Sequence, residues 1–275
     1  MKLYNTKTGI VIEQNEQFYQ YPGNWEQTIN DDNIYQKLLS VLPSLKKTDA
    51  KSIELLLPCI GAAQELWACG VTYHRSMVGR QEESAAAGGS DFYAKVYEAE
   101  RPECFFKSTP HRVVGHGAQV RIRKDSQWDV PEPELTLVVT SSGKIIGYTV
   151  GNDMSSRSIE GENPLYLPQA KTYDGCAAVG PCVFLTDQPF PADANIELLI
   201  TRNNRMVFEG SVSVSRIKRS LQELVSFVYR ECSFPNGCLI MTGTGIVPGN
   251  DFTLKSGDSI SIRIDNIGTL VNSVQ

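Results

Sequence analysis

The sequence predicts an α+β protein that is mainly β, with a small N-terminal α/β domain at residues 1–62 and a larger β-rich domain at residues 63–275. Two observations lead to this prediction. Segments that alternate polar and apolar residues, as half-buried strands do, recur at 119–123, 197–201 and 259–264. A break at Pro58-Cys59-Ile60-Gly61 separates the first domain from the rest.

Composition excludes several classes of protein. The chain has 275 residues, of which 41% are hydrophobic and 21% charged, so it is neither collagen-like, disordered nor a coiled coil. Its net charge of -5 provides no basic field for phosphates, and nucleic acid is not an expected partner. No apolar run approaches the roughly 20 residues of a membrane helix, and the first residues lack the apolar core of a signal peptide. We therefore expect a cytoplasmic protein with no membrane partner.

Cysteine and histidine usage restricts the metal chemistry. The 7 cysteines are odd in number and form no C-x-x-C pattern, so buried thiols in a reducing compartment are a better interpretation than a disulfide framework or a zinc site. Only 3 histidines are present, which makes a nitrogen and sulfur metal site hard to build. A bound metal should then be a hard cation on carboxylates.

The N-terminal elements follow from periodicity. Residues 10–12 and 18–21 predict short strands, and residues 33–42 have apolar side chains at helical spacing. Residues 52–57 return to strand character before a proline. The following polar segment at 79–90, rich in Ala, Gly and Glu, fits a mobile lid and a surface helix equally well.

Strand patterns dominate the second domain. Residues 135–139 predict a buried strand and residues 145–150 a second one, and the short turn between them contains Gly143. This arrangement is typical of a hairpin. Residues 221–229 are the one clear late helix, with apolar residues on one face.

Two carboxylates stand at the entrance of the predicted hairpin. Glu132 and Glu134 are two residues apart, so in an extended chain their side chains leave the same face of one strand. Carboxylates held that close repel each other unless a cation or a proton lies between them. A solvated acidic turn is the alternative. The apolar strand that follows directly favours a pair carried into the body of the fold.

A third carboxylate follows the second strand of the hairpin. If the hairpin forms, Asp153 lies just beyond the end of the strand next to Glu132 and Glu134. The three can then converge on an octahedral cation and leave positions open for water and substrate. Alternatively, Asn152-Asp153 is a turn or the N-cap of a helix at 154–159, which the spacing allows equally well.

Two further motifs could complete a site. Lys171 stands in the segment Gln169 to Gly175, and a lysine beside a metal in a closed pocket can act as a base at neutral pH. A surface lysine before a turn is the alternative. The loop Met241-Thr242-Gly243-Thr244-Gly245 offers hydroxyl and N–H groups that could hold a carboxylate, although a tight turn explains the same pattern.

The motifs resemble those of the fumarylacetoacetate hydrolase superfamily in order and spacing, over roughly residues 65–275. They are E-x-E-L at 132–135, G-Y-T-V-G-N-D-M-S-S-R at 147–157, A-K-T-Y-D-G at 170–175, V-G-P at 179–181, T-G-T-G at 242–245 and I-G-T-L-V-N at 267–272. The resemblance implies that residues 63–275 form a fumarylacetoacetate hydrolase-like catalytic domain of rolled mixed sheets. It also implies a homo-oligomer, a dimer or tetramer.

The same resemblance implies a cofactor and its ligands. A divalent cation, usually Mg²⁺ with Mn²⁺ or Ca²⁺ as alternatives, would be held by the positions matching Glu132, Glu134 and Asp153. Lys171 would face the substrate.

One departure narrows the activity. Members that hydrolyse or decarboxylate commonly carry G-x-N-Y-x-x-H, but in the matching stretch, Gly70 to Ser76, Ser76 occupies the His position. The loss of that His argues against hydrolysis. This stretch and residues 99–107 resemble the branch that dehydrates 2-keto-3-deoxy sugar acids, which includes the arabonate and xylonate dehydratases.

The leading hypothesis is therefore a Mg²⁺-dependent dehydratase that converts a small-molecule 2-keto acid, 2-keto-3-deoxy-pentonate, to 2,5-dioxopentanoate. Lys171 would remove the C3 proton, and Glu103 is favoured over Glu82 or Glu83 as the acid that assists loss of the C4 hydroxyl. A surface position for Glu103 remains an alternative. The candidate substrate-binding residues are Arg75, Ser76, Lys107 and Thr244.

Two other functions stay open at this point. The pocket could serve a hydrolase, decarboxylase or isomerase of a related 2-oxo or diketo acid, with His74 or His111 in place of the missing His. A non-catalytic 2-oxo acid binding protein would keep the metal and lack an effective acid. The presence of Lys171 makes this last function the least favoured.

Overall fold

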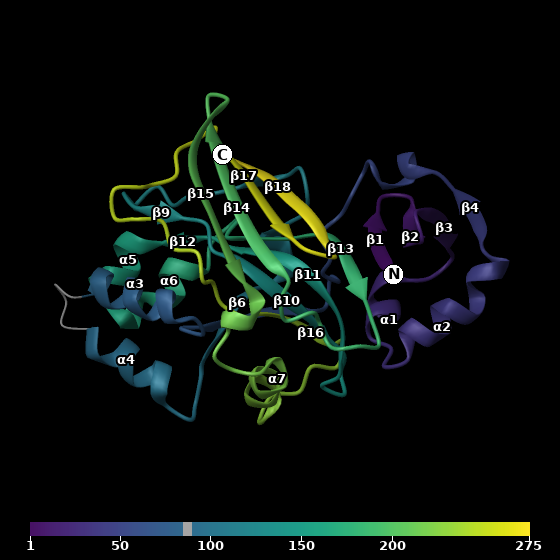
Figure 1. The fold of residues 1–275 in the computed structure, drawn as a ribbon, viewed down its shortest axis with the longest axis horizontal. Coiled ribbons are helices and arrows are strands. Elements are labelled where there is room, and N and C mark those ends of the chain that lie inside the picture. Colours follow the sequence, from purple (N-terminus) through teal and green to yellow (C-terminus); the bar gives the residue numbers. More distant parts are fainter. Residues whose placement is uncertain (85–89) are drawn as a thin grey trace.

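The architecture is a mainly β fold in which a large mixed sheet runs through the molecule (Figure 1). The structure is a computed structural model that describes residues 1–84 and 90–275, with the backbone alone for residues 83, 84 and 90. The strands of this main sheet, in spatial order, are β4 (Lys46–Thr48), β3 (Gln17–Tyr21), β2 (Gly9–Gln14), β1 (Lys2–Thr6), β13 (Ala177–Leu185), β11 (Ile145–Asp153), β10 (Pro133–Val139), β16 (Cys238–Met241), β5 (Glu65–Gly70) and β6 (Glu103–Ser108), with β7 (Val113–Val114) beside β13. The predicted α+β, mainly β class is confirmed.

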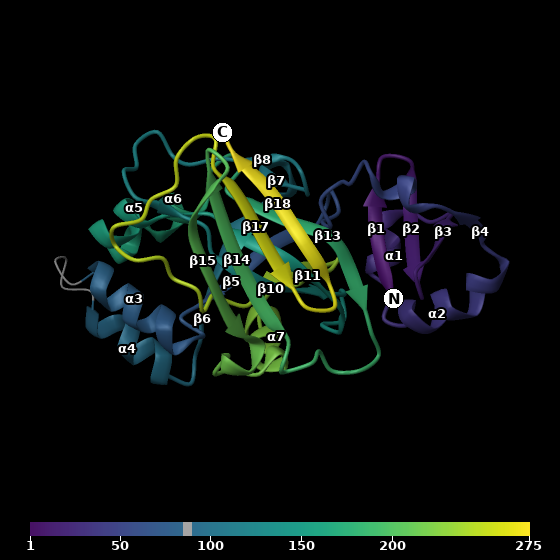
Figure 2. The ribbon, with the colours of Figure 1, turned by 45° about the horizontal axis from the view of Figure 1, so that its top comes forward.

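A second sheet packs across one face of the main sheet (Figure 2). Its strands, in spatial order, are β15 (Arg205–Ser213), β14 (Asn195–Arg202), β17 (Ser259–Ile264), β18 (Gly268–Val274) and β8 (Gln119–Val120). In β17 the isoleucines at 260, 262 and 264 are buried and the residues between them are not, as the alternation predicts. These side chains meet Leu135 and Leu137 of β10 in the larger hydrophobic core. Burial of this apolar surface holds the two sheets together.

The N-terminal residues gather at one end of the molecule (Figure 1). Their strands extend the main sheet, and their two helices cover its other face. Helices α1 (Trp25–Ile29) and α2 (Ile34–Val41) bury Ile29, Ile34 and Leu38 in a second core, against strands β1 and β2. Strand β1 pairs with β13, so the sheet continues from the N-terminal part into the rest of the chain. A domain division at residue 62 stays a prediction.

The remaining helices lie mostly at the opposite end (Figure 1). They are α3 (His74–Ser84), α4 (Ser90–Glu98), α5 (Arg157–Glu162) and α6 (Leu167–Lys171), while α7 (Leu221–Tyr229) packs below the main sheet. The predicted late helix has the bounds of α7, and Ser220 caps it by accepting a hydrogen bond from the Glu223 N–H at 3.1 Å. Short 3₁₀ helices connect the elements: η1 (Leu42–Ser44), η2 (Ala50–Ile53), η4 (Pro110–Arg112), η5 (Pro164–Tyr166) and η6 (Val214–Arg216).

Two predicted strands are corrected. The segment 52–57 is not a strand, because Asp49 accepts a hydrogen bond from the Lys51 N–H at 2.9 Å and starts the 3₁₀ helix η2; Leu56 forms an isolated bridge with Thr6. The strand expected at 119–123 stops after two residues as β8, since the Arg121 N–H donates to the Gly175 carbonyl instead of a neighbouring strand. Part of the ambiguous segment 79–90 belongs to α3 and α4, and residues 85–89 lie outside the described residues.

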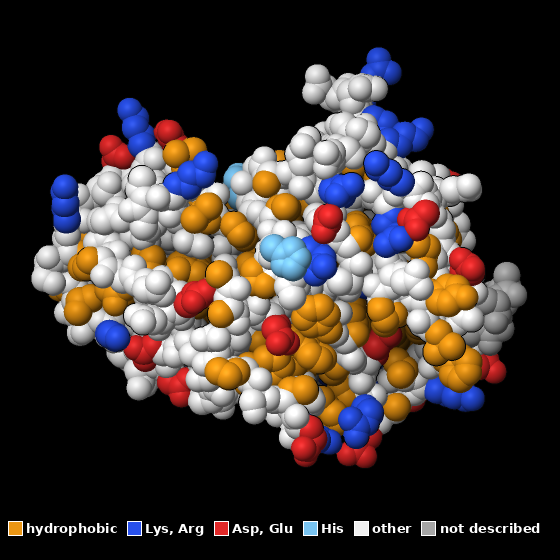
Figure 3. Space-filling model, turned by 180° about the vertical axis from the view of Figure 1, so that it is seen from behind, with side chains coloured by type: hydrophobic (Ala, Val, Ile, Leu, Met, Phe, Trp, Pro, Cys, Tyr) orange, Lys and Arg blue, Asp and Glu red, His pale blue; other side chains and the backbone are white. Residues whose placement is uncertain are grey.

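The surface carries mixed charge. Figure 3 shows basic and acidic side chains interspersed over one face rather than gathered in a single basic patch. Among the described residues, no helix combines the length and the apolar character needed to cross a membrane.

A two-stranded ribbon fixes the entrance to β10. Strand β9 (Asp129–Val130) pairs with β12 (Ser155–Ser156), and the Leu254 N–H donates to the Asp129 carbonyl at 2.9 Å. The Asp129 side chain is 2% exposed, and its Oδ1 has no hydrogen-bond partner among the described residues. Burial raises the pKa of this carboxyl to about 6.

The raised pKa predicts a pH-dependent stability. The folded state holds the Asp129 proton up to about pH 6, whereas the unfolded chain releases it near its ordinary value of 3.8. The free energy of unfolding therefore falls as pH rises between these values, by up to about 3 kcal/mol. We expect Asp129→Asn to be more stable than the wild type at pH 8 and to keep only about a third of that difference at pH 4.5, as measured by urea unfolding. An equal difference at both pH values would contradict a raised pKa for Asp129 in the folded state.

Candidate active site

Three buried carboxylates converge where β10 begins and β11 ends. Glu132 precedes β10, Glu134 is its second residue, and Asp153 is the last residue of β11. One oxygen from each lies within 4.8 Å of the others, and the three residues are 4%, 2% and 1% exposed. The Asp153 N–H donates to the Glu132 carbonyl at 2.9 Å, so the hairpin ladder itself sets Asp153 beside Glu132.

The helix alternative for this segment is wrong. Asp153 does not cap a helix at 154–159, since the chain continues extended through β12 and α5 begins at Arg157. The cap is Ser156, whose hydroxyl accepts a hydrogen bond from the Ile159 N–H at 3.3 Å. Asp153 is thereby left to the carboxylate cluster.

Among the described residues, Glu134 is the member of the cluster that forms no ion pair. Burial raises the pKa of Glu134 well above its usual range, and the neighbouring Asp153 and Glu132 raise it further. Burial also acts to raise the pKa of Glu132, but Lys171, Arg157 and Arg80 outweigh it and hold that pKa below its usual range. Hard oxygen donors that converge on a shared position are what a divalent cation requires. The three residues fit such an ion.

Lys171 shares this cluster. It is the last residue of α6, is 1% exposed, and its Nζ donates to the Ser155 hydroxyl at 2.6 Å. The same amine contacts a Glu132 oxygen and lies 3.0 Å from Asp153 Oδ2. The amine therefore lies next to any group that the carboxylates hold.

Glu103 is the first residue of β6 and lies opposite Gly70 of strand β5. A Cβ on Gly70 would lie 1.9 Å from Glu103 Oε2, so only glycine leaves room for this carboxyl. Burial raises the pKa of Glu103, while Arg80 and Lys171 partly offset the rise, which puts the carboxyl within the field of the cluster. A carboxyl whose pKa is raised in this way is suited to act as a general acid.

The alternative acids are placed differently. Glu82 is exposed and pairs with Arg75 at 3.4 Å, away from the carboxylates. The side chain of Glu83 lies outside the described residues.

Lys107, which is predicted to bind substrate, is enclosed next to Asp153. Its side chain is fully buried, and its Nζ donates to the Met154 carbonyl at 2.9 Å and to the Lys171 carbonyl. It also pairs with Asp153 Oδ1 at 2.5 Å. These three contacts use the donors of the ammonium group, so Lys107 is arranged to position Asp153 and Lys171.

The other predicted substrate-binding residues also have local partners. Ser76 donates to the Tyr73 carbonyl at 2.7 Å at the start of α3, and Arg75 is exposed. Thr244 donates to the Ile246 carbonyl at 3.2 Å. A role for Arg75, Ser76 and Thr244 in substrate binding stays a prediction.

The T-G-T-G loop holds a carboxylate, as its pattern suggested, but the carboxylate belongs to the protein. The Gly243 N–H donates to Glu134 Oε2 at 2.6 Å. Gly243 has φ of 91°, and a Cβ there would lie 2.1 Å from the Thr72 hydroxyl. Glycine is therefore required for this close approach.

Sequence reasoning missed a buried ionic network around the site. Arg80 of α3 and Arg157 of α5 both reach Glu132 Oε1, at 3.5 and 2.7 Å. Glu160 is 1% exposed, contacts Arg80 and lies 3.8 Å from Lys171 Nζ. The sequence contains two signals for these arginines. Arg80 follows Ser76 by one helical turn, and Arg157 ends the G-N-D-M-S-S-R motif.

None of the histidines joins the cluster. His74 is exposed and its ring stacks edge-on against Tyr97 at 6.0 Å, and His111 is exposed beside Thr109. His116 accepts a hydrogen bond from the Val271 N–H at 3.3 Å.

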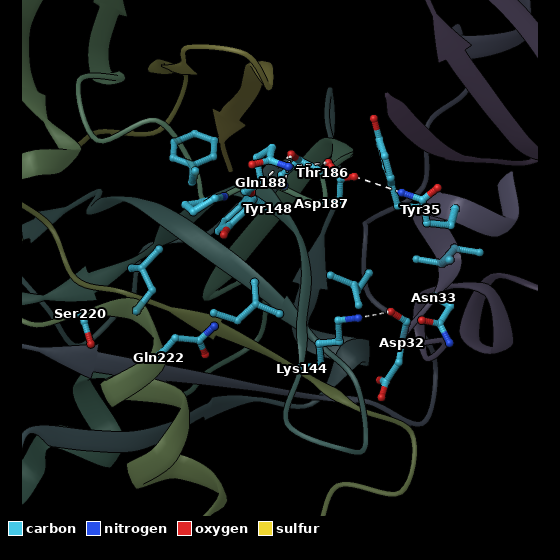
Figure 4. A pocket seen from close by; sticks show the side chains of 17 residues that line it. Asp32, Asn33, Tyr35, Lys144, Tyr148, Thr186, Asp187, Gln188, Ser220 and Gln222 are labelled. Carbon is cyan, nitrogen blue, oxygen red and sulfur yellow. Dashed lines mark hydrogen bonds between the residues drawn. The ribbon is translucent and has the colours of Figure 1, made fainter. Parts of the chain in front are cut away.

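A cavity of about 510 Å³ lies elsewhere, between α2, the β10–β11 turn and α7 (Figure 4). Its charged groups are paired at the rim: Lys144 donates to the Asp32 carbonyl at 2.6 Å, and Asp187 accepts from Gln36 at 3.0 Å. No predicted site residue lines this cavity.

The fold and the carboxylate site define a known family. A model of the fumarylacetoacetate hydrolase C-terminal domain matches residues 76–275, and the chain belongs to this family.

Two relatives and one solved structure are particularly similar. The chain is 50% identical over 213 residues to a probable 2-keto-3-deoxyxylonate dehydratase of Haloferax volcanii, covering 77% of this chain and 72% of the relative. It is 46% identical over the same shares to 2-dehydro-3-deoxy-D-arabinonate dehydratase of Saccharolobus solfataricus. A solved 2-keto-3-deoxy-D-arabinonate dehydratase, in complex with magnesium and 2,5-dioxopentanoate, superposes with a TM-score of 0.84 and 35% identity, over 100% of this chain and 99% of that one.

The carboxylate cluster predicts its own metal affinity. We expect Glu134→Gln or Asp153→Asn, and likewise Glu132→Gln, to weaken Mg²⁺ binding by roughly 100-fold or more, because each removes a negative ligand of a hard dication. Calorimetric titration measures this. Glu197→Gln, an exposed carboxylate on β14, is the matched control and should bind as the wild type does. Unchanged affinity in all three site variants would remove these residues from a metal site.

The enclosed position of Lys107 predicts a stability effect. Lys107→Met leaves Asp153 without its buried partner, so the free energy of unfolding should fall by about 3–5 kcal/mol. Saturating Mg²⁺ should restore more stability in the variant than in the wild type, because the dication replaces the lost positive charge. Thermal unfolding with and without Mg²⁺ measures both effects. Lys124→Met, which alters an exposed lysine, should change neither.

Proposed function

We propose that the protein is a Mg²⁺-dependent hydro-lyase that dehydrates a 2-keto-3-deoxy-pentonate to 2,5-dioxopentanoate. The observation that carries the proposal is the arrangement of Lys171 and Glu103 beside three buried carboxylates, with every histidine elsewhere. An amine base and a carboxyl acid suit an elimination. A hydrolase would need a group that activates water, and Ser76 stands at the position where hydrolytic members of the superfamily carry a His.

Glu132, Glu134 and Asp153 would hold the metal, since they are the buried carboxylates whose oxygens converge. When bound, Mg²⁺ polarises the 2-keto group of the substrate and acidifies the C3 hydrogens. The protein contributes the fixed geometry: the β10–β11 ladder sets Asp153 against Glu132, and the Gly243 N–H sets Glu134.

The protein's own groups then move the protons. Lys171 Nζ takes a proton from C3, and the Glu103 carboxyl donates one to the C4 hydroxyl, which leaves as water. The resulting C3–C4 double bond moves to C4–C5 when a C5 proton leaves and one returns to C3. This enol then becomes the aldehyde as C4 gains a proton and the hydroxyl loses one. The overall change is the loss of one water molecule.

The relatives support the substrate class. Both curated relatives are named as dehydratases of 2-keto-3-deoxy-pentonates, and the solved structure holds magnesium and 2,5-dioxopentanoate. Identity near 50% over most of both chains makes this reaction the best supported one.

The division of labour between Lys171 and Glu103 can be tested. Lys171→Ala should lower turnover by roughly two to four orders of magnitude and abolish deuterium exchange at C3. Its Mg²⁺ affinity should not fall, because the amine repels a cation at the carboxylates. Glu103→Gln should keep C3 exchange while loss of the C4 hydroxyl stalls. NMR in D₂O follows exchange, and an aldehyde assay follows dehydration.

A matched variant sharpens this test. Glu82→Gln alters the alternative acid on α3 and should retain both exchange and dehydration. If Lys171→Ala and Glu103→Gln lose both processes equally, the assignment of base and acid to separate residues is wrong.

We also propose that the protein is a cytoplasmic homo-oligomer, a dimer or tetramer. The family resemblance supports the assembly, and the 7 cysteines, all free, fit a reducing compartment. Analytical ultracentrifugation measures the assembly, and a monomer at micromolar concentration would overturn that part of the proposal.

A further inference from the structure

Two thiols face each other next to the proposed acid. Cys69 of β5 and Cys104 of β6 are directly opposite in the antiparallel ladder, one position from the pair of Gly70 and Glu103. Their sulfur atoms lie 3.6 Å apart. Residues opposite in an antiparallel pair have Cα atoms about 4.5–5.5 Å apart, which is within the range that a disulfide bridges.

We propose that Cys69 and Cys104 form a reversible disulfide under oxidising conditions and that this bond slows the dehydration. A covalent bond needs the sulfur atoms at about 2.05 Å, roughly 1.5 Å closer than in the reduced protein. Reversible disulfides of this kind are the ones found in proteins of reducing compartments.

The two thiols differ in accessibility, which gives the reaction an order. Cys104 is partly exposed, whereas Cys69 is 1% exposed. The hydrogen bond from Cys69 lowers the pKa of Cys104, which favours its thiolate. With a peroxide as oxidant, the Cys104 thiolate attacks one oxygen, gives a sulfenic acid and releases water or an alcohol. Cys69 then attacks the Cys104 sulfur, the S–S bond forms, and a second water leaves.

The link to activity runs through the backbone. Neighbouring side chains of a strand point to opposite faces, so the thiols lie on the face away from Glu103 and Gly70. Drawing Cys104 toward Cys69 shifts the adjacent pair, in which Glu103 Oε2 already occupies the space where a Gly70 Cβ would be. Misplacing a catalytic group by about 1 Å can cost on the order of 100-fold in rate. This second step rests on the proposed role of Glu103, and the disulfide itself does not.

The experiment treats the full-length protein with hydrogen peroxide in the presence of Mg²⁺. Mass spectrometry of non-reduced peptides should find residues 69 and 104 cross-linked, with the loss of two hydrogens. Turnover should fall by roughly tenfold to 100-fold, and dithiothreitol should restore it. Cys104→Ser and Cys69→Ala should form no such cross-link and should retain turnover after the same treatment. Cys232→Ser, which removes an exposed thiol, should respond as the wild type does.

The outcomes separate the two steps. A cross-link that leaves turnover unchanged overturns the effect on rate and keeps the disulfide. Absence of the 69–104 cross-link while Cys232 is oxidised overturns the proposal, as does equal inactivation of Cys104→Ser. If the reduced protein shows no dehydration at all, the proposed function fails, but the mass measurement still decides whether the disulfide forms.

Discussion

The mutual repulsion of three buried carboxylates is the constraint on which the rest of the site depends. Glu132, Glu134 and Asp153 would separate or take up protons if the hairpin ladder did not fix their backbones. Cations from several elements offset the repulsion between these carboxylates. They are Lys171 of α6, Lys107 of β6, Arg80 of α3 and Arg157 of α5. The helices at that end of the molecule are thereby bound electrostatically to the sheet.

The two buried lysines of the site differ in the partners of their ammonium groups. Lys107 has its ammonium fully engaged by two carbonyls and Asp153, so it acts as a fixed part of the scaffold. Lys171 is held by side chains rather than by backbone carbonyls, and its partners are the same oxygens that a cation would take. The amine that is free to exchange partners is the one proposed to carry the proton.

Local patterns were sufficient to predict the hairpin, the late helix and the convergence of Glu132, Glu134 and Asp153. Each depends on periodicity or on a short ladder, so residues near in sequence determine it. The positions of Lys107 and Glu160 could not be predicted, because Lys107 pairs with Asp153 and Glu160 contacts Arg80, and both partners are distant in sequence. The 3₁₀ helix at Ala50–Ile53 was missed for another reason: the Asp49 side chain competes with strand pairing.

Resemblance to a family contributed what local patterns could not, namely the hypothesis that the carboxylates, Lys171 and Glu103 belong to one site. It did not convey which motif residues point inward. Ser76 and Thr244 stand in the expected motifs, yet both hydroxyls donate to backbone carbonyls of their own segments. Position in a motif and direction of a side chain are separate facts, and only the second depends on the packed structure.

The order of strands has a consequence for how the site responds to motion. The carboxylates stand on β10 and β11, in the interior of the main sheet with a paired strand on each side, whereas Glu103 stands on β6, the last strand of the sheet among the described residues. An edge strand has one ladder to break instead of two, so local opening there requires the least free energy. The fold thus gives the proposed metal ligands a rigid frame and leaves the proposed proton donor on an edge strand, which opens more easily.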